Sequence, residues 1–197
     1  AQYTSLKEEL ITSSNMRVTS DQFYKELLAD EKKIVGYFDG RFNSHNPNHE
    51  DASVIDPSTD YILGTFTSAY NVYLTKELGW ESNTPYYVVN DAVDSWEDEK
   101  PVDITSQKQI DVLPDLTELL VKNKSFRVIV ASGFYDPCTP YFTAVQTFKK
   151  IDLPESCLKR ISMHFYEAGH LMYINEKAHN DLTTHLREFL QNEQVRP

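Results

Sequence analysis

Two side chains able to form an acid–base pair occupy equivalent places in the second half of the chain. Asp136 follows the apolar run 126–132, and His170 follows the apolar run 161–166. Open α/β sheets place their chemistry beyond the carboxyl ends of parallel strands, where such residues meet. A histidine exchanges protons near neutral pH, and a carboxylate on its far ring nitrogen fixes the tautomer. The pair therefore predicts two members of a hydrolytic triad.

The nucleophile of such a triad is not evident. No serine of the chain lies in G-x-S-x-G, the strand-to-helix elbow that exposes a nucleophilic serine. Ser132 is close to Asp136, but Ala-Ser-Gly at a strand end is no such elbow. Cys138 lies beside Asp136 and has no partner base next to it in sequence. A nucleophilic role is disfavoured for both residues.

The elements around the pair alternate between strand and helix patterns. Apolar runs at 127–132 and 161–166 are typical of buried strands, whereas 141–150 and 176–191 carry apolar residues at helical spacing. This alternation favours parallel β/α units and an α/β fold. One further strand is predicted at 86–90. A sheet this small leaves apolar edges open, so we expect either a longer protein or association with a second copy.

The first half is predicted to be rich in helices. Helical spacing is found over 4–13 and 20–34, and Asp56-Pro57 supplies a cap with proline at the first helical position. Gly79 is expected to end that third helix. A further helix is predicted over 114–121.

Composition argues against several classes of partner. The 197 residues include 19 Lys and Arg against 30 Asp and Glu, a net charge of −11, which disfavours nucleic acid and anionic membranes. No apolar run approaches the ~20 residues that span a bilayer. The polar start of the chain shows no signal peptide.

Metal-binding patterns in the sequence are weak, and no metal or nucleotide cofactor is implied. Cys138 and Cys157 fit no zinc or redox motif, and both a disulfide between them and two independent thiols stay open. His45 and His49 are four apart beside acidic residues, but Asn-Pro between them breaks the helix that would align them. A solvated loop is favoured there.

In these motifs the chain resembles the serine carboxypeptidase family, the carboxypeptidase Y-like branch of the α/β-hydrolase fold, and bacterial members above all. Ser132-Gly-Phe-Tyr-Asp136-Pro-Cys-Thr is similar to the segment that holds the family's triad acid. Glu167-Ala-Gly-His170-Leu-Met-Tyr is similar to the segment of its triad histidine. The order Asp before His matches that fold. Residues 35–42 and the helix after Asp56 resemble the family's cap or insertion region.

The resemblance implies the carboxyl-terminal part of an α/β-hydrolase sheet over 101–197, preceded by a helix-rich cap or insertion segment over 1–100. It implies that Asp136 and His170 serve the removal of carboxyl-terminal residues from peptides. The family's nucleophile and its carboxylate-binding acids belong to an amino-terminal half that the likeness does not cover. We therefore expect this chain to be inactive alone, to need that half as a partner, and to self-associate. A secreted or periplasmic location is favoured by the same likeness.

Two alternatives remain open. The chain could be a non-catalytic binding or assembly module of α/β-hydrolase descent. It could also belong to an esterase or other acyl hydrolase of related fold, because fold and triad do not fix the substrate.

Overall fold

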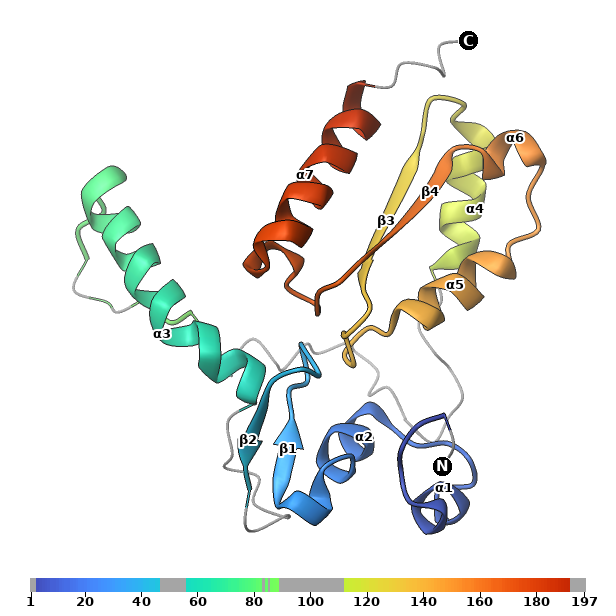
Figure 1. The fold of residues 1–197 in the computed structure, drawn as a ribbon. Helices are drawn as coiled ribbons and strands as arrows, with labels where there is room; N and C mark the ends of the chain where they lie inside the picture. The colour runs from blue at the N-terminus through green and yellow to red at the C-terminus, as the bar shows by residue number, and fades with distance from the viewer. Residues whose placement is uncertain (1–2, 47–55, 83, 85, 89–111, 192–197) are drawn as a thin grey trace.

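Two small sheets and the helices around them make up the computed structural model (Figure 1), which describes residues 3–46, 56–82, 84, 86–88 and 112–191. The elements of the first half are α1 (Glu8–Ser13), α2 (Ser20–Glu26), the 3₁₀ turn η1 (Ala29–Glu31), β1 (Lys33–Val35), β2 (Asn43–His45), α3 (Pro57–Val72) and the π-helical turn η2 (Tyr73–Glu77). Those of the second half are α4 (Leu113–Lys122), β3 (Val128–Gly133), α5 (Tyr141–Lys149), α6 (Glu155–Leu158), β4 (Ile161–Tyr166), the 3₁₀ turn η4 (Met172–Ile174) and α7 (Glu176–Gln191).

Strands β3 and β4 form the parallel pair that positions the site. Their register runs from Val128 opposite Ile161 to Gly133 opposite Tyr166. One face packs on a cluster around Leu120 of α4, and the other packs on Ala178 of α7. Helices α5 and α6 connect the two strands. The mixture of helices with a parallel strand pair is compatible with the predicted α/β class.

The predicted strands and helices of the second half are confirmed within a residue or two at each end. Each of β3 and β4 has a single neighbouring strand among the residues that the structure describes. The strand predicted at 86–90 is not found: residues 86–88 lie in no strand, and 89–90 lie outside the described residues.

The helix predicted over 20–34 is wrong in its second half. Helix α2 begins with a capping box between Thr19 and Gln22 and ends at Glu26. Lys32 then adopts the left-handed conformation, with φ at 55°, and turns the chain into β1. Ile34 is buried on β1, which pairs antiparallel with β2. An apolar residue at this position fits helical spacing as well as strand alternation, so the left-handed residue decides the outcome.

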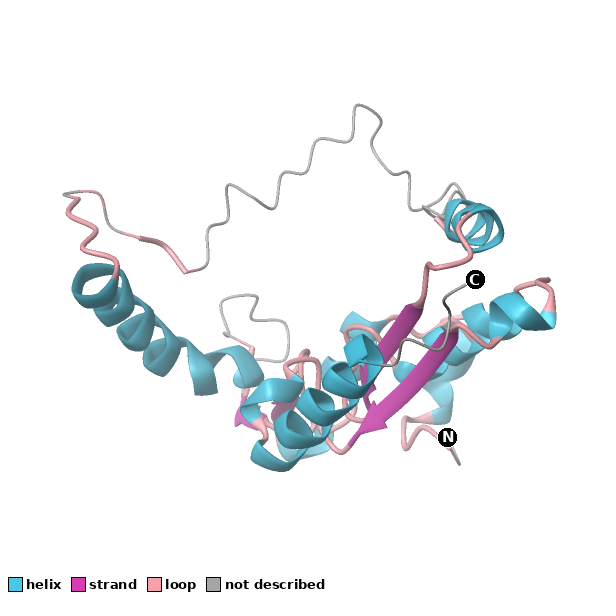
Figure 2. Cartoon of the chain, turned by 90° about the horizontal axis from the view of Figure 1, so that it is seen from above, coloured by secondary structure: helices cyan, strands magenta, loops and turns pink. Residues whose placement is uncertain are grey.

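Helix α3 begins as predicted and is poorly covered; it ends at Val72, and the π-helical turn η2 continues the helical path to Glu77. Asp56 caps it by accepting a hydrogen bond from the Thr59 amide at 2.8 Å, and Gly79, at φ +61°, follows the end of η2. Its apolar side chains are largely exposed, with 44% of Phe66 accessible, although Leu74, just beyond its end, is buried. In both views α3 extends away from the β3–β4 sheet (Figure 1, Figure 2). None of the described helices is both long enough and apolar enough to cross a bilayer.

Candidate active site

Asp136 and His170 meet just beyond the carboxyl ends of β3 and β4. The His170 Nδ1 atom lies 2.9 Å from the Asp136 Oδ2 atom. The aspartate side chain is only 3% exposed, whereas that of the histidine is 37% exposed. With Nδ1–H donating to the carboxylate, Nε2 is the ring atom that accepts a proton. No hydrogen bond to Nε2 is found among the described residues.

Thr139 completes the hydrogen bonding of the buried carboxylate. Its amide donates to Asp136 Oδ1 at 2.9 Å, and its hydroxyl donates to Oδ2 at 2.6 Å. The same hydroxyl oxygen lies 3.1 Å from His170 Nδ1. Thr139 belongs to no motif singled out in the sequence, although a threonine three residues after an aspartate is a usual spacing for local side-chain-to-backbone bonds.

The loop between β1 and β2 touches both strand-end segments. The His170 amide donates to the Phe38 carbonyl at 2.7 Å, and the Gly40 amide donates to the Tyr135 carbonyl at 2.8 Å. A Cβ atom on Gly169 would come within 2.4 Å of the Phe38 carbonyl oxygen. The absence of a side chain at position 169 therefore lets the loop hold the histidine backbone.

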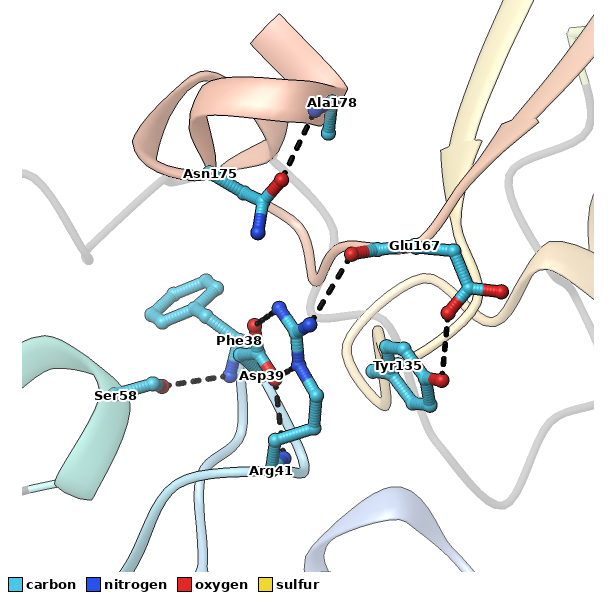
Figure 3. Close-up of polar contacts among 8 residues, drawn as sticks. All are labelled: Phe38, Asp39, Arg41, Ser58, Tyr135, Glu167, Asn175 and Ala178. Atoms are coloured by element: carbon cyan, nitrogen blue, oxygen red, sulfur yellow. Dashed lines mark hydrogen bonds and ion pairs between the residues drawn. The ribbon is translucent and has the colours of Figure 1, made fainter.

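An ion pair at the tip of this loop joins the same segments (Figure 3). The Asp39 carboxylate is 4% exposed and accepts hydrogen bonds from Arg41 Nε at 2.9 Å and Nη2 at 2.6 Å. Arg41 Nη1 donates to the Glu167 carbonyl at 3.1 Å, and its guanidinium lies 4.6 Å from the centre of the Tyr135 ring. The hydrogen bond to Asp39 raises the pKa of Arg41. Arg41 thus ties the residue before Asp136 to the turn before His170.

The start of α3 anchors the loop from its other side. Figure 3 shows the Phe38 amide donating to the Ser58 hydroxyl, at 3.1 Å. The Tyr37 amide donates a hydrogen bond to the carboxylate of Asp56, which also accepts one from the Ser58 hydroxyl. The cap of α3 therefore also fixes the loop that contacts His170. No local sequence signal connects these positions, which lie about twenty residues apart.

Cys138 lies within the candidate site, and both cysteines are free thiols. Cys157 is buried in the cluster around Leu120, so the disulfide alternative does not hold in this structure. The pKa of Tyr37 is raised to about 12. Its hydrogen bond with Cys138 is the largest cause, and burial is the next. The ligand atoms of Asp136, Cys138 and His170 all lie within 4.8 Å of one another, so these three residues could hold a metal ion.

Ser132 and the histidines of the first half take no part in the site. Ser132 is buried at the end of β3, and no hydrogen bond to His170 is found for it in the described part of the chain. His45 is exposed on β2, and His49 lies outside the described residues.

The histidines of α7 differ from each other. His179 is exposed. His185 is half-buried: its Nδ1 atom lies 3.0 Å from the Tyr166 hydroxyl, and its ring stacks on His164 at 4.2 Å between ring centres. The pKa of His164 is lowered. Burial is the larger cause, and the neighbouring His185 is the smaller one.

A pocket of about 760 Å³ opens beside the aspartate. It lies between the first two helices and the segment after β3, and apolar side chains such as Leu6, Phe23, Leu27, Phe134 and Tyr141 line most of it. Asp136 belongs to its wall. A pocket of this size and lining suits an apolar group of a small ligand.

No family model, curated protein or solved structure matches this chain. What the site can do is therefore argued from its geometry. A histidine held by a buried carboxylate can take a proton at Nε2 and return it, while the carboxylate stabilises the imidazolium. Acceptance and return of a proton at one atom is the chemistry that acyl transfer requires.

Proposed function

We propose that Asp136 and His170 are the acid and the general base of a serine-type hydrolase similar to the serine carboxypeptidases. In this proposal a segment outside these 197 residues contributes the nucleophilic serine. One observation carries it: the 2.9 Å contact between His170 Nδ1 and a carboxylate that is 3% exposed. The isolated chain is then inactive as a peptidase.

The proposed reaction uses His170 twice. Nε2 takes the proton of the serine hydroxyl as its oxygen attacks the carbonyl of the last peptide bond. The same proton passes to the leaving amine as the carbon–nitrogen bond breaks. Water then attacks the acyl-enzyme, giving one proton to Nε2, and that proton returns to the serine. Asp136 keeps the ring oriented and stabilises its positive charge in both halves.

The arrangement of elements supports the finer assignment of fold. An acid after β3 and a histidine after the next parallel strand follow the chain order of α/β-hydrolases. We infer that 101–197 is the carboxyl-terminal part of such a sheet, that 1–100 is a helix-rich cap or insertion segment, and that an amino-terminal half is its partner. A secreted or periplasmic site of action goes with this proposal.

The apolar pocket beside Asp136 favours a second candidate, an esterase or acyl hydrolase. Its volume of about 760 Å³ would accept an acyl chain as readily as an apolar side chain of a peptide. A non-catalytic binding module could use the same pocket.

The test begins with the reading frame upstream of Ala1. The proposal requires a G-x-S-x-G elbow there, and its absence would refute the proposal. The full polypeptide is then assayed on blocked dipeptides and on simple esters, which separates peptidase from esterase.

We expect Asp136→Asn and His170→Gln each to lower kcat by about 10³–10⁴-fold. His179→Gln, on an exposed residue of α7, is the matched control. Full activity in the Asp136 or His170 variant would exclude their proposed roles.

A further inference from the structure

The candidate site brings together one oxygen, one sulfur and one nitrogen ligand. We propose that Asp136, Cys138 and His170 bind Zn²⁺ or a similar divalent ion of intermediate softness, and that the bound ion blocks the acid–base pair. The metal site itself stands on the geometry alone. Its inhibitory effect rests on the proposed function.

The donor atoms are close to the spacing that such an ion needs. All three lie within 4.8 Å of one another. Zinc bonds of 2.0–2.3 Å in a tetrahedron place ligand atoms roughly 3.3–3.8 Å apart. The Nδ1 to Oδ2 distance of 2.9 Å must therefore widen slightly, and the thiol must move inward by about an ångström at most. Side-chain rotations supply shifts of this size.

The donor types select the class of metal. Thiolate and imidazole ligands suit zinc and its neighbours, whereas Mg²⁺ and Ca²⁺ are bound by oxygen atoms alone. Three protein ligands with a fourth position open to water are a usual arrangement for zinc. His170 is 37% exposed and Cys138 is half-buried, so an ion can reach the site from solvent.

Neighbouring groups already orient two of the three ligands. Thr139 binds both oxygens of Asp136, and the Phe38 carbonyl holds the His170 amide. Outer partners of this kind fix ligand geometry in metal sites.

A metal at this position removes the interaction on which the base depends. Binding releases the thiol proton and the Nδ1 proton to solvent and forms bonds from sulfur and from Nδ1 to the metal. Nδ1 then has no proton to donate to Asp136, and the carboxylate charge is neutralised by the ion. The imidazolium that the hydrolase needs cannot form.

The test uses the purified 197-residue chain, with Co²⁺ as the optical probe and a thiol-free reductant. We expect a thiolate-to-cobalt band in the near ultraviolet that saturates at one ion per chain and is removed by Zn²⁺. Cys138→Ser should abolish the band. Cys157→Ser, which removes the other free thiol, should keep it. Loss of a group that only orients a metal ligand typically lowers metal affinity roughly tenfold or more. His170→Gln removes a ligand itself, so it should lower Co²⁺ affinity by at least that factor.

A second measurement needs no variant. Zn²⁺ should protect Cys138 of the unchanged chain from alkylation by iodoacetamide, as mapped by peptide mass spectrometry. Absence of the band, its persistence in Cys138→Ser, or absence of protection would each overturn the metal site. A chain that binds Co²⁺ in this way while the full polypeptide hydrolyses nothing keeps the metal site and loses the proposed hydrolase.

Discussion

At the scale of single residues, the site depends on positions where backbone segments touch. Gly169 lies against the β1–β2 loop, and an added Cβ atom would approach Phe38 O within 2.4 Å and Asp39 Cβ within 2.5 Å. Distances below 3 Å force backbone to move. The hydrogen bond from the His170 amide to the Phe38 carbonyl is the first contact that such a movement would break.

We therefore expect Gly169→Ala to lower the free energy of unfolding by about 1–3 kcal/mol, the usual cost of overpacking. Chemical denaturation monitored by circular dichroism measures it. The matched control is Gly64→Ala on α3, where an added Cβ atom meets nothing within 4 Å. Because alanine favours a helix interior over glycine, the control should gain about 0.5–1 kcal/mol. Equal stability of the two variants would show that position 169 is not packed as described.

The pair of Asp136 and His170 is visible in the sequence because each residue follows its own apolar run. Their supporting partners are not visible in the same way. Arg41 and the Glu167 carbonyl are 126 positions apart, and only the folded chain brings them together. Thr139 was predictable in principle, since its bonds to Asp136 are local. Residue patterns thus predict the candidate pair better than they predict the contacts that hold it in place.

At the scale of elements, the contact between β4 and α7 contains a stacked pair of histidines. His164 and His185 lie 4.2 Å apart between ring centres, and Tyr166 bonds to the latter. Burial, and after it the neighbouring His185, lower the pKa of His164, while Glu188 acts in the opposite direction. The folded state therefore binds fewer protons here than the unfolded state, whose histidine pKa is about 6.5.

This difference predicts a loss of stability in mild acid. Above about pH 6.5 both states hold a neutral His164, and its contribution is fully present. As pH falls from there toward the lowered folded pKa, protonation favours unfolding. We expect urea midpoints to fall between about pH 7 and pH 5. His164→Phe keeps an aromatic ring in the stack and should flatten that dependence, whereas His179→Gln should leave it unchanged. An identical pH dependence in both variants would contradict the prediction.

Short elements are the part of the fold that the sequence predicted least well. Helices α4, α5 and α7 have long periodic patterns and are found where expected. Strand β1 has three residues, too few to show alternation, and its partner β2 is polar. Strand β1 pairs with β2 because the chain turns at Lys32, which is in the left-handed conformation. Lysine has no preference for this conformation, so the sequence does not predict the turn.

At the scale of the whole molecule, apolar surface is left without cover in the described part of the chain. Strands β3 and β4 each use one edge, so rows of backbone donors and acceptors face outward. The aromatic face of α3 is also open, with 68% of Tyr61 exposed. These features favour association, whereas the net charge of −11 opposes it by repulsion between copies.

We therefore expect the chain to self-associate through the open edges of its β3–β4 sheet. Light scattering at micromolar concentration should give a mass above 22.8 kDa that rises with protein concentration. Added salt should increase it, because screening weakens the repulsion between copies while the backbone hydrogen bonds between strand edges persist. Tyr61→Lys tests the other open surface: it should leave the mass unchanged if the strand edges carry the contact. A monodisperse monomer of the unchanged chain would contradict the prediction. A monomeric Tyr61→Lys variant would show that the contact is made by α3 and not by the strand edges.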